Sequence, residues 1–223
     1  MEHVPEQTVQ ELLSTIIPWF DREQAFICDT ARTDFGARLA VAAALLDSGK
    51  VQEGTLLLQS IATAEKTGDE EQDSSRIRAC MELAYLLMDE LKYDQAENLL
   101  WEARKEYANV PELEFLREEI SLLIAQCRFG QGFILEAIER AEEIMHKLKS
   151  MNADQAQVAK VYQHLGWFHL HKSDVPQAMI YLKQAMELAP SLDRELVDAG
   201  LEAEKNNDYE KAVEYYFDAI EYE

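Results

Sequence analysis

Small residues recur along the chain at a fixed interval, and this interval constrains the fold more than any other feature of the sequence. Gly166 and Gly200 are 34 residues apart, and Ala178 and Ala212 have the same separation. Residues 162–190 contain two helical patterns of apolar residues, joined by a polar turn. Helix axes usually lie about 8–10 Å apart, and a Gly or Ala at the contact permits the short end of that range. The sequence therefore predicts antiparallel helix pairs that repeat along the chain.

The helix pair at residues 162–190 also carries a specific motif. Its matching positions are Tyr162, Leu165, Gly166, Ala178, Leu182 and Pro190. This set resembles the tetratricopeptide repeat, whose pattern is W-x2-L-G-x2-Y, then A-x3-F, then P. His169 stands where that pattern has its Tyr. The resemblance implies an all-α fold, an α-α superhelix in which antiparallel helix pairs stack into a right-handed solenoid.

Earlier parts of the chain repeat the same small residues at a longer interval. Gly54, Ala96, Ala137 and Ala178 follow one another at separations of 42, 41 and 41 residues. The additional length is about two helical turns at roughly 3.6 residues per turn, so longer helices can absorb it without rotating the apolar face. We therefore expect an array at residues 34–223 with about five repeats, at residues 34–68, 76–110, 117–150, 158–192 and 193–223.

Residues 1–33 match the motif poorly, and we expect them to form capping helices that cover the first repeat. Apolar residues from Val9 to Ile17 have helical spacing, and Pro18 is expected to end that helix because it lacks an N–H donor. A second short apolar helix is expected to lead to Cys28. Between the first two repeats, the polar and acidic segment 69–75 is expected to be a solvated loop.

The balance of charge excludes whole classes of partner. The chain has 43 Asp and Glu residues against 21 Lys and Arg, which gives a formal net charge of −22. A surface of this sign repels nucleic-acid phosphates and anionic lipid, so we expect no nucleic-acid partner and no membrane partner. We expect a protein or peptide partner, and the charge favours a basic one.

The cysteines and the N-terminus indicate the cellular compartment. Cys28, Cys80 and Cys127 are odd in number and widely spaced, with no His at metal-ligand spacing, so we interpret them as reduced and buried. The N-terminus lacks the basic start and continuous apolar core of a signal peptide, and no run of 18 apolar residues occurs. We therefore expect a cytoplasmic protein.

The resemblance also implies where a ligand would bind. In tetratricopeptide repeat proteins the first helix of each repeat lines the concave surface, and ligands usually bind there. The faces opposite the Gly or Ala contacts then predict a protein-binding groove of Arg78, Met81, Glu82, Tyr85, Met88, Leu122, Gln126, Phe129, Lys160, Gln163, His164, Trp167, His171, Arg194, Val197, Asp198, Leu201 and Glu204. Its mixture of aromatic residues, Met and few charges is typical of protein-binding surfaces. Trp167 is the best single anchor, and packing against a neighbouring helix is its alternative role.

Catalytic and metal-binding signals are absent from the sequence. It has no G-x-x-x-x-G-K-[ST], G-x-G-x-x-G, G-x-S-x-G or H-E-x-x-H motif, so we predict a non-enzymatic protein without a cofactor. On a helix, His164 and His171 would lie about 10.5 Å apart along the axis, too far to share one metal ion. His169 points away from both.

One well-known subclass of the family binds the C-terminal carboxylate of chaperones with a clamp of Lys, Asn and Arg on successive first helices. The matching positions in this chain are Leu39, Ala43, Glu82, Glu119 and Leu123. None of these side chains can bind a carboxylate, and a Glu would repel it. The role of a chaperone-tail adaptor is therefore disfavoured.

Three functions are compatible with the pattern. The leading hypothesis is a scaffold or adaptor that binds a peptide or protein segment in its groove. The second is a peptide-responsive bacterial signalling regulator of the Rap type, which also uses long repeats; the absence of a helix-turn-helix and the short segment 1–33 count against it. The third is self-association as a homodimer through the C-terminal helix, which carries Tyr215, Tyr216, Phe217, Ile220 and Tyr222.

Overall fold

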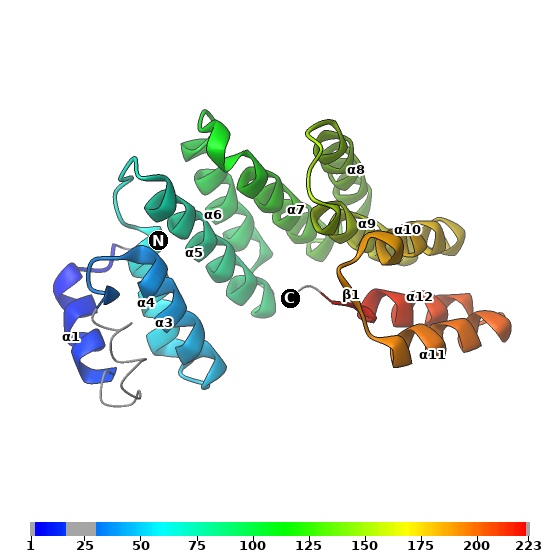
Figure 1. Ribbon diagram of the computed structural model, residues 1–223, viewed down its shortest axis with the longest axis horizontal. Helices are drawn as coiled ribbons and strands as arrows, with labels where there is room; N and C mark the ends of the chain where they lie inside the picture. The colour runs from blue at the N-terminus through cyan, green and yellow to red at the C-terminus, as the bar shows by residue number, and fades with distance from the viewer. Residues whose placement is uncertain (1–2, 17–29, 222–223) are drawn as a thin grey trace. The chain divides into compact units, whose positions relative to one another are not determined.

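The structure is a computed structural model of the chain, and it describes residues 3–16 and 30–221. The chain forms two compact units, residues 1–117 and residues 118–223 (Figure 1). The expected helix break at Pro18 and the expected short helix leading to Cys28 lie outside the described residues. The division of the chain into a cap and five repeats remains a prediction.

Helices make up nearly all the regular structure of the described residues, as the all-α prediction requires. Unit 1 contains α1 (Glu6–Ile16), α3 (Phe35–Asp47), α4 (Val51–Ala62), α5 (Glu70–Asp89), α6 (Tyr93–Glu106) and the 3-10 turn η2 (Pro111–Leu113). Helix α7 (Glu114–Gly130) begins at the end of unit 1 and continues in unit 2. Unit 2 then contains α8 (Ile134–Ser150), α9 (Gln155–His171), α10 (Val175–Leu188), β1 (Ser191–Leu192), α11 (Arg194–Lys205), α12 (Tyr209–Asp218) and β2 (Ile220–Glu221).

Consecutive helices pack as pairs, α3 on α4, α5 on α6, α9 on α10 and α11 on α12. Each pair is joined by a short turn, which makes its two helices antiparallel. The turns at Gly49, Gly132, Ser173 and Asn207 contain residues with positive φ, at 78°, 89°, 64° and 59°. Gly and Asn adopt this left-handed conformation more readily than other residues, which favours the turns at Gly49, Gly132 and Asn207. Ser173, and Leu91 in the turn between α5 and α6, adopt the same conformation without that advantage. The predicted antiparallel helix pairs are confirmed.

The small residues lie where the two helices of a pair come closest. A Cβ atom added to Gly166 would lie 2.5 Å from Leu182 Cγ and 3.2 Å from the carbonyl oxygen of Ala178. The same addition to Gly200 would overlap the ring of Tyr216. The predicted close contact is therefore confirmed, and it requires residues without a side chain at both positions.

The expectation of a solvated loop at residues 69–75 is wrong. Helix α5 begins at Glu70, and the Asp69 carboxylate caps it by accepting a hydrogen bond from the N–H of residue 72 at 2.9 Å. Asp and Glu in a first turn are stabilised by the positive end of the helix dipole, so this composition favours the start of a helix. Asp73 is buried and accepts hydrogen bonds from two backbone N–H groups of the preceding turn, at 3.0 and 3.2 Å.

The longer interval between the early repeats corresponds to longer helices. Helices α5, α7 and α9 contain 20, 17 and 17 residues, whereas α11 contains 12. Whole additional turns lengthen a helix without changing which of its faces is apolar. None of the helices in the described part of the chain is long and apolar enough to cross a membrane.

The last helix pair docks through its second helix, whereas the pair α5 and α6 docks through its first. In unit 1, α5 packs against both α3 and α4. In unit 2, the helix that packs against both α9 and α10 is α12, and Figure 1 shows it between α10 and α11. Ala212, Val213 and Tyr216 of α12 are fully buried. Strand β2 then pairs with β1, and the N–H of Asp193 donates to the carbonyl oxygen of Ala219 at 2.8 Å.

A buried arginine joins the N-terminal helix to the first helix pair. Arg38 on α3 is 2% exposed. Its guanidinium donates to the carbonyl oxygens of Ala31 and Arg32 at 2.9 Å and to Ser60 Oγ at 3.3 Å. It also donates to the Glu6 carboxylate of α1 at 3.1 Å, although the Glu6 side chain is 60% exposed. Burial of this charge is tolerated because its N–H groups all have acceptors.

We predict that Gly166→Ala lowers the free energy of unfolding by about 1–2 kcal/mol. Overpacking typically costs about 1–3 kcal/mol, and the helix-propensity gain of Ala over Gly, roughly 1 kcal/mol, offsets only part of it. Urea denaturation followed by circular dichroism measures the difference. The control is Gly36→Ala, where the nearest atom to the added Cβ is Asp34 Oδ1 at 3.3 Å, at the end of a side chain, and a smaller loss of stability is expected. Equal effects of the two substitutions would contradict the prediction.

We also predict unequal effects at the two ends of the Arg38–Glu6 ion pair. Arg38→Met removes the donor to the carbonyl oxygen of the buried Ala31 and should lower the free energy of unfolding by roughly 3 kcal/mol. Glu6→Gln removes only an exposed partner and should cost less than about 1 kcal/mol. The same denaturation measurement compares them. If Glu6→Gln proved as costly as Arg38→Met, the ion pair itself would be the source of the stability.

Candidate functional site

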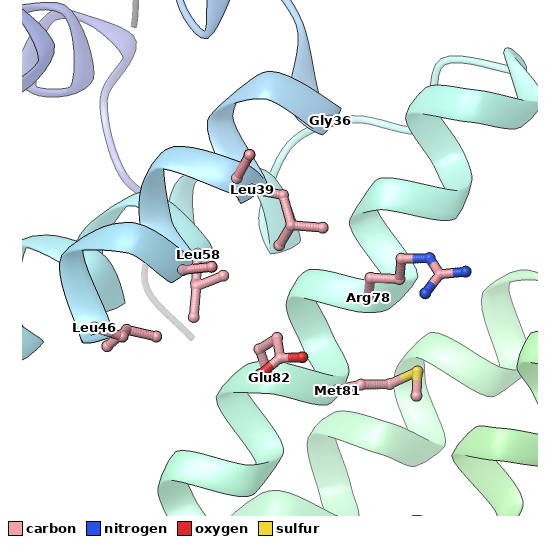
Figure 2. A pocket seen from close by; sticks show the side chains of 9 residues that line it. Gly36, Leu39, Leu46, Leu58, Arg78, Met81 and Glu82 are labelled. Carbon is pink, nitrogen blue, oxygen red and sulfur yellow. The ribbon is translucent and has the colours of Figure 1, made fainter. Parts of the chain in front are cut away.

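Three of the predicted groove residues meet at a pocket in unit 1. The pocket has a volume of about 360 Å³. It is lined by Gly36, Leu39, Ala40, Ala43 and Leu46 of α3, Leu58 of α4, and Arg78, Met81 and Glu82 of α5. Figure 2 shows the side chains of α3 and α4 on one side of this space and those of α5 on the other. Tyr85 and Met88, farther along α5, are half-buried and do not line the pocket.

The pocket has an apolar floor because α3 is apolar on nearly every side. The α3 sequence, FGARLAVAAALLD, packs Val41, Ala42 and Leu45 into the core. Its outer face presents Ala40 and Ala43, both exposed and both small. Side chains of this size leave a hollow between α3 and α5 that Leu or Met at the same positions would fill.

In unit 2 four of the predicted groove residues belong to a cluster of rings contributed by α7, α9 and α12. This aromatic cluster consists of Phe129, His164, Trp167, Phe168, His171 and Phe217. Each ring contacts two others, so the six form a closed circuit in which neighbouring centroids lie 4.4–6.3 Å apart. These separations are those of stacked and edge-on aromatic pairs. Phe168 is buried at the inner side of the cluster, whereas His171 is exposed and Trp167 is half-buried.

Two glutamines fix the polar edge of the aromatic cluster. The Nε2 atoms of Gln126 and His164 lie 3.1 Å apart, and Gln163 Nε2 donates to the carbonyl oxygen of Phe217 at 2.7 Å. Since an amide N–H only donates, His164 Nε2 must accept and therefore carries no proton. Burial, together with the smaller effect of the Lys160 charge, lowers the pKa of His164 to about 3. His164 is thus a neutral acceptor at physiological pH.

The remaining predicted groove residues lie elsewhere in unit 2. Leu122 is 4% exposed and belongs to the hydrophobic core, so it has almost no surface to offer a partner. Arg194 and Leu201 are exposed on α11, together with Asp198, while Val197 and Glu204 are half-buried. Because α12 rather than α11 packs on α9 and α10, these residues are not part of the aromatic cluster.

The structure places further residues in the pocket and in the aromatic cluster, where the sequence did not indicate them. Leu39 and Ala43 drew attention only as positions unsuited to binding a carboxylate, yet both line the pocket. The sequence placed Phe217 in a C-terminal helix that was proposed for self-association, whereas in the structure its ring centroid lies 4.7 Å from that of Trp167. The run of apolar residues in α3 was a signal for the pocket. The contact of Phe217 had no such signal, because it depends on how α12 docks.

A second pocket lies in unit 2, between α10 and the pair of α11 and α12. Its volume is about 420 Å³. Its lining is Val175, Pro176, Met179, Ile180, Lys183, Glu204 and Tyr209. Lys183 Nζ and Glu204 Oε1 form an ion pair at 2.8 Å, and hydrogen bonding from Lys183 lowers the pKa of Glu204. Apart from Glu204, this pocket contains none of the predicted groove residues.

The other titratable groups of interest are buried within the fold. No three His, Cys, Asp or Glu side chains of the described residues are placed to hold a metal ion. His169 is buried with its Nδ1 3.4 Å from Asp174 Oδ2, and burial lowers its pKa against the opposing effect of Asp174. Cys80 and Cys127 are buried. Burial raises the pKa of Cys80 to about 12, which keeps this thiol protonated and unreactive at neutral pH.

We predict that His164 makes the protein less stable in mild acid. Below about pH 6.5 the unfolded chain binds a proton at this imidazole, whereas the folded protein does so only near pH 3. Its contribution to stability is therefore complete above pH 6.5 and declines as the pH falls. Urea denaturation at pH 7 and pH 5 should show a smaller loss of stability for His164→Gln than for the wild type. The exposed His171→Gln serves as the control, and an unchanged pH response of His164→Gln would contradict the assignment.

Comparison with known proteins identifies the repeat. A family model described as tetratricopeptide repeat matches residues 159–192, which include Gly166 and Ala178. No curated protein matches the chain.

Solved structures of repeat proteins share the fold. The crystal structure of BtubC (BKLC) from P. vanneervenii is 19% identical, with a TM-score of 0.63, over 91% of this chain and 87% of that one. Two crystal structures of nearly identical TPR-like repeats of a putative kinesin light chain from Podosopora anserina are also 19% identical. Their TM-scores are 0.55 and 0.53, and the matches cover 84% of this chain and 96% and 97% of those chains.

At this level of identity the similarity establishes the fold alone. It agrees with the helix pairs, the glycine contacts and the 34-residue match described above. The chain therefore carries a tetratricopeptide repeat and has the helical-repeat fold of tetratricopeptide-like solenoid proteins, as its sequence motif indicated.

Proposed function

We propose that the protein is a non-enzymatic interaction module whose pocket between α3 and α5 binds a segment of a partner protein. A tetratricopeptide-type fold supports a role in protein interaction in general. The observation that carries the more specific proposal is the pocket, an apolar hollow of about 360 Å³ that includes Arg78, Met81 and Glu82. Pockets of roughly 300–1,000 Å³ lined mainly by apolar groups, with a few polar ones, are typical of binding sites.

The pocket supplies both affinity and orientation. A partner side chain placed against Leu39, Leu58 and Met81 would be removed from water together with them. Burying one large apolar side chain contributes roughly 1.5–3 kcal/mol, which is about tenfold or more in affinity. Arg78 and Glu82 carry opposite charges one helical turn apart, so the polar groups of a bound segment would be favoured in one direction along the pocket.

The residues that line the pocket support binding rather than catalysis. They include no Ser, Thr, Cys, His or Lys, and Glu82 is their one carboxylate. Nucleophilic or acid–base catalysis normally needs a nucleophile or a second titratable group within hydrogen-bond distance of the first. The lining therefore supports a site that holds its ligand unchanged.

The aromatic cluster of unit 2 is proposed as a second contact surface of the same module. Trp167 packs against Phe217 of the neighbouring helix, so part of its ring serves the fold, as its alternative role anticipates. The ring also contacts His171, but Trp167 is only half-buried and His171 is exposed, so part of this surface is accessible. Aromatic and His side chains of this kind are frequent at protein interfaces.

Two other hypotheses receive less support. Self-association drew on the aromatic residues of the C-terminal helix, but Tyr216 is fully buried and Phe217 contacts Trp167 within unit 2. The peptide-responsive regulator would use the same kind of groove, and no contact of the described residues favours it over a scaffold. A cytoplasmic location is proposed from the odd number and wide spacing of the three cysteines.

We predict that filling the pocket abolishes peptide binding. In affinity selection of a random-peptide phage library on the full chain, clones that bind the wild type should lose about tenfold or more of their binding to Ala43→Trp. Ala43 is exposed on α3, so the larger side chain can enter the pocket without disturbing the core. Circular dichroism verifies that the variant is folded.

The matched control is Asn98→Trp, an exposed position on α6 of the same unit, which should bind the same clones as the wild type. A third variant, Trp167→Ala, reports the clones that use the aromatic cluster. If every selected clone bound Ala43→Trp as well as it bound the wild type, the pocket would not be the binding site.

A further inference from the structure

We infer that the pocket between α3 and α5 selects a basic, apolar segment, in which an apolar side chain enters the pocket and a Lys or Arg lies beside it at the end formed by Leu46 and Glu82. This inference rests on the proposed function and specifies the chemistry of the partner. It is carried by the way the fold distributes charge around the pocket.

The fold hides most of the positive charge of the two helices that form the pocket. Helices α3 and α5 contain three arginines and no lysine. Arg38 is 2% exposed and donates to Glu6, and Arg76 is 6% exposed and donates to Glu106 at 2.8 Å. Both guanidinium groups are thus paired within unit 1 and contribute little positive charge to the surface of these helices. The arginine that remains exposed on these helices is Arg78.

Most of the negative charge of the same helices stays on the surface, although Asp73 of α5 is buried. Glu82 lines the pocket, and Asp47 directly follows the lining residue Leu46. Asp89 lies seven residues beyond Glu82, about 10 Å along the helix axis. All three carboxylates are exposed. Because charges interact over a Debye length of about 8–10 Å at ordinary ionic strength, Asp47, Glu82 and Asp89 act together on a group bound near Glu82.

The two ends of the pocket differ in sign. Helices α3 and α5 run in the same direction, since each is antiparallel to α4. Gly36 and Arg78 therefore lie towards the N-terminal end of the pocket, and Leu46 and Glu82 towards the C-terminal end, as Figure 2 shows. Helix α3 ends at Asp47, so the negative end of its dipole adds to the carboxylates there. A cation on the bound segment is favoured at this end and repelled by Arg78 at the other.

The body of the pocket requires an apolar side chain. Between Arg78 and Glu82 the lining consists of aliphatic side chains, Met81 and small residues. A charged group pushed into this region would lose its hydration without gaining a partner. Leu39 and Leu58 instead offer surface that an aliphatic or aromatic side chain can cover. The combination of an apolar floor with an acidic end matches a segment that alternates apolar and basic residues.

The experiment uses the phage selection on the full chain and examines the sequences of clones that Ala43→Trp fails to bind. We expect Lys and Arg to be enriched at least about twofold over the unselected library in these clones, and Asp and Glu to be depleted. A synthetic peptide of the most frequent sequence should bind Glu82→Lys about five- to tenfold more weakly than the wild type. Its affinity for the wild type should also fall as NaCl is raised.

The matched control is Glu71→Lys, which makes the same change of charge on α5 about 16 Å from Glu82 along the axis, and should leave the affinity nearly unchanged. Pocket-dependent clones without enrichment of Lys and Arg, or equal effects of the two Lys substitutions, would overturn the inference while leaving the proposed function intact. Selected clones that all bind Ala43→Trp would overturn both.

Discussion

The structure depends on the close approach of paired helices at glycine. Gly166 and Gly200 place no atoms in the space that Leu182 and Tyr216 occupy, so the larger side chains rest against the backbone of the partner helix. Interiors packed at this density do not tolerate an additional methyl group without displacement of their neighbours. The contact fixes how each helix is rotated within its pair. It thereby decides which residues face the next pair and which face solvent.

The charge that remains on the surface of α3 and α5 depends on which of their charged side chains are buried in the interior of unit 1. Arg38 and Arg76 are buried, and their guanidinium groups donate to backbone carbonyls and to the carboxylates of Glu6 and Glu106 within unit 1. The fold thus removes positive charge from the surface of α3 and α5 and leaves Asp47 and Glu82 exposed. The acidic character of the pocket is in this sense a consequence of how unit 1 is held together.

The sequence predicted the features that arise from local pattern. The antiparallel helix pairs and the glycine contacts follow from spacing along the chain, and they were found where expected. Segment 69–75 was misassigned because an acidic loop and an acidic helix start have the same composition. The N-cap at Asp69 and the buried carboxylate of Asp73 distinguish the two, but the burial of Asp73 is visible only in the folded structure.

Docking between pairs escaped prediction for a different reason. Both helices of the last pair carry apolar residues, so either could have packed on α9 and α10, and the choice of α12 brought Phe217 to Trp167. The sequence by itself determined the helix pairs and the close contact inside each, because these depend on neighbours at fixed spacing. Only the tertiary structure decided the pocket and the aromatic cluster. A hollow exists where side chains from separate helices do not fill the space between them. The spacing of residues along the chain does not indicate this, because it depends on how the helices pack.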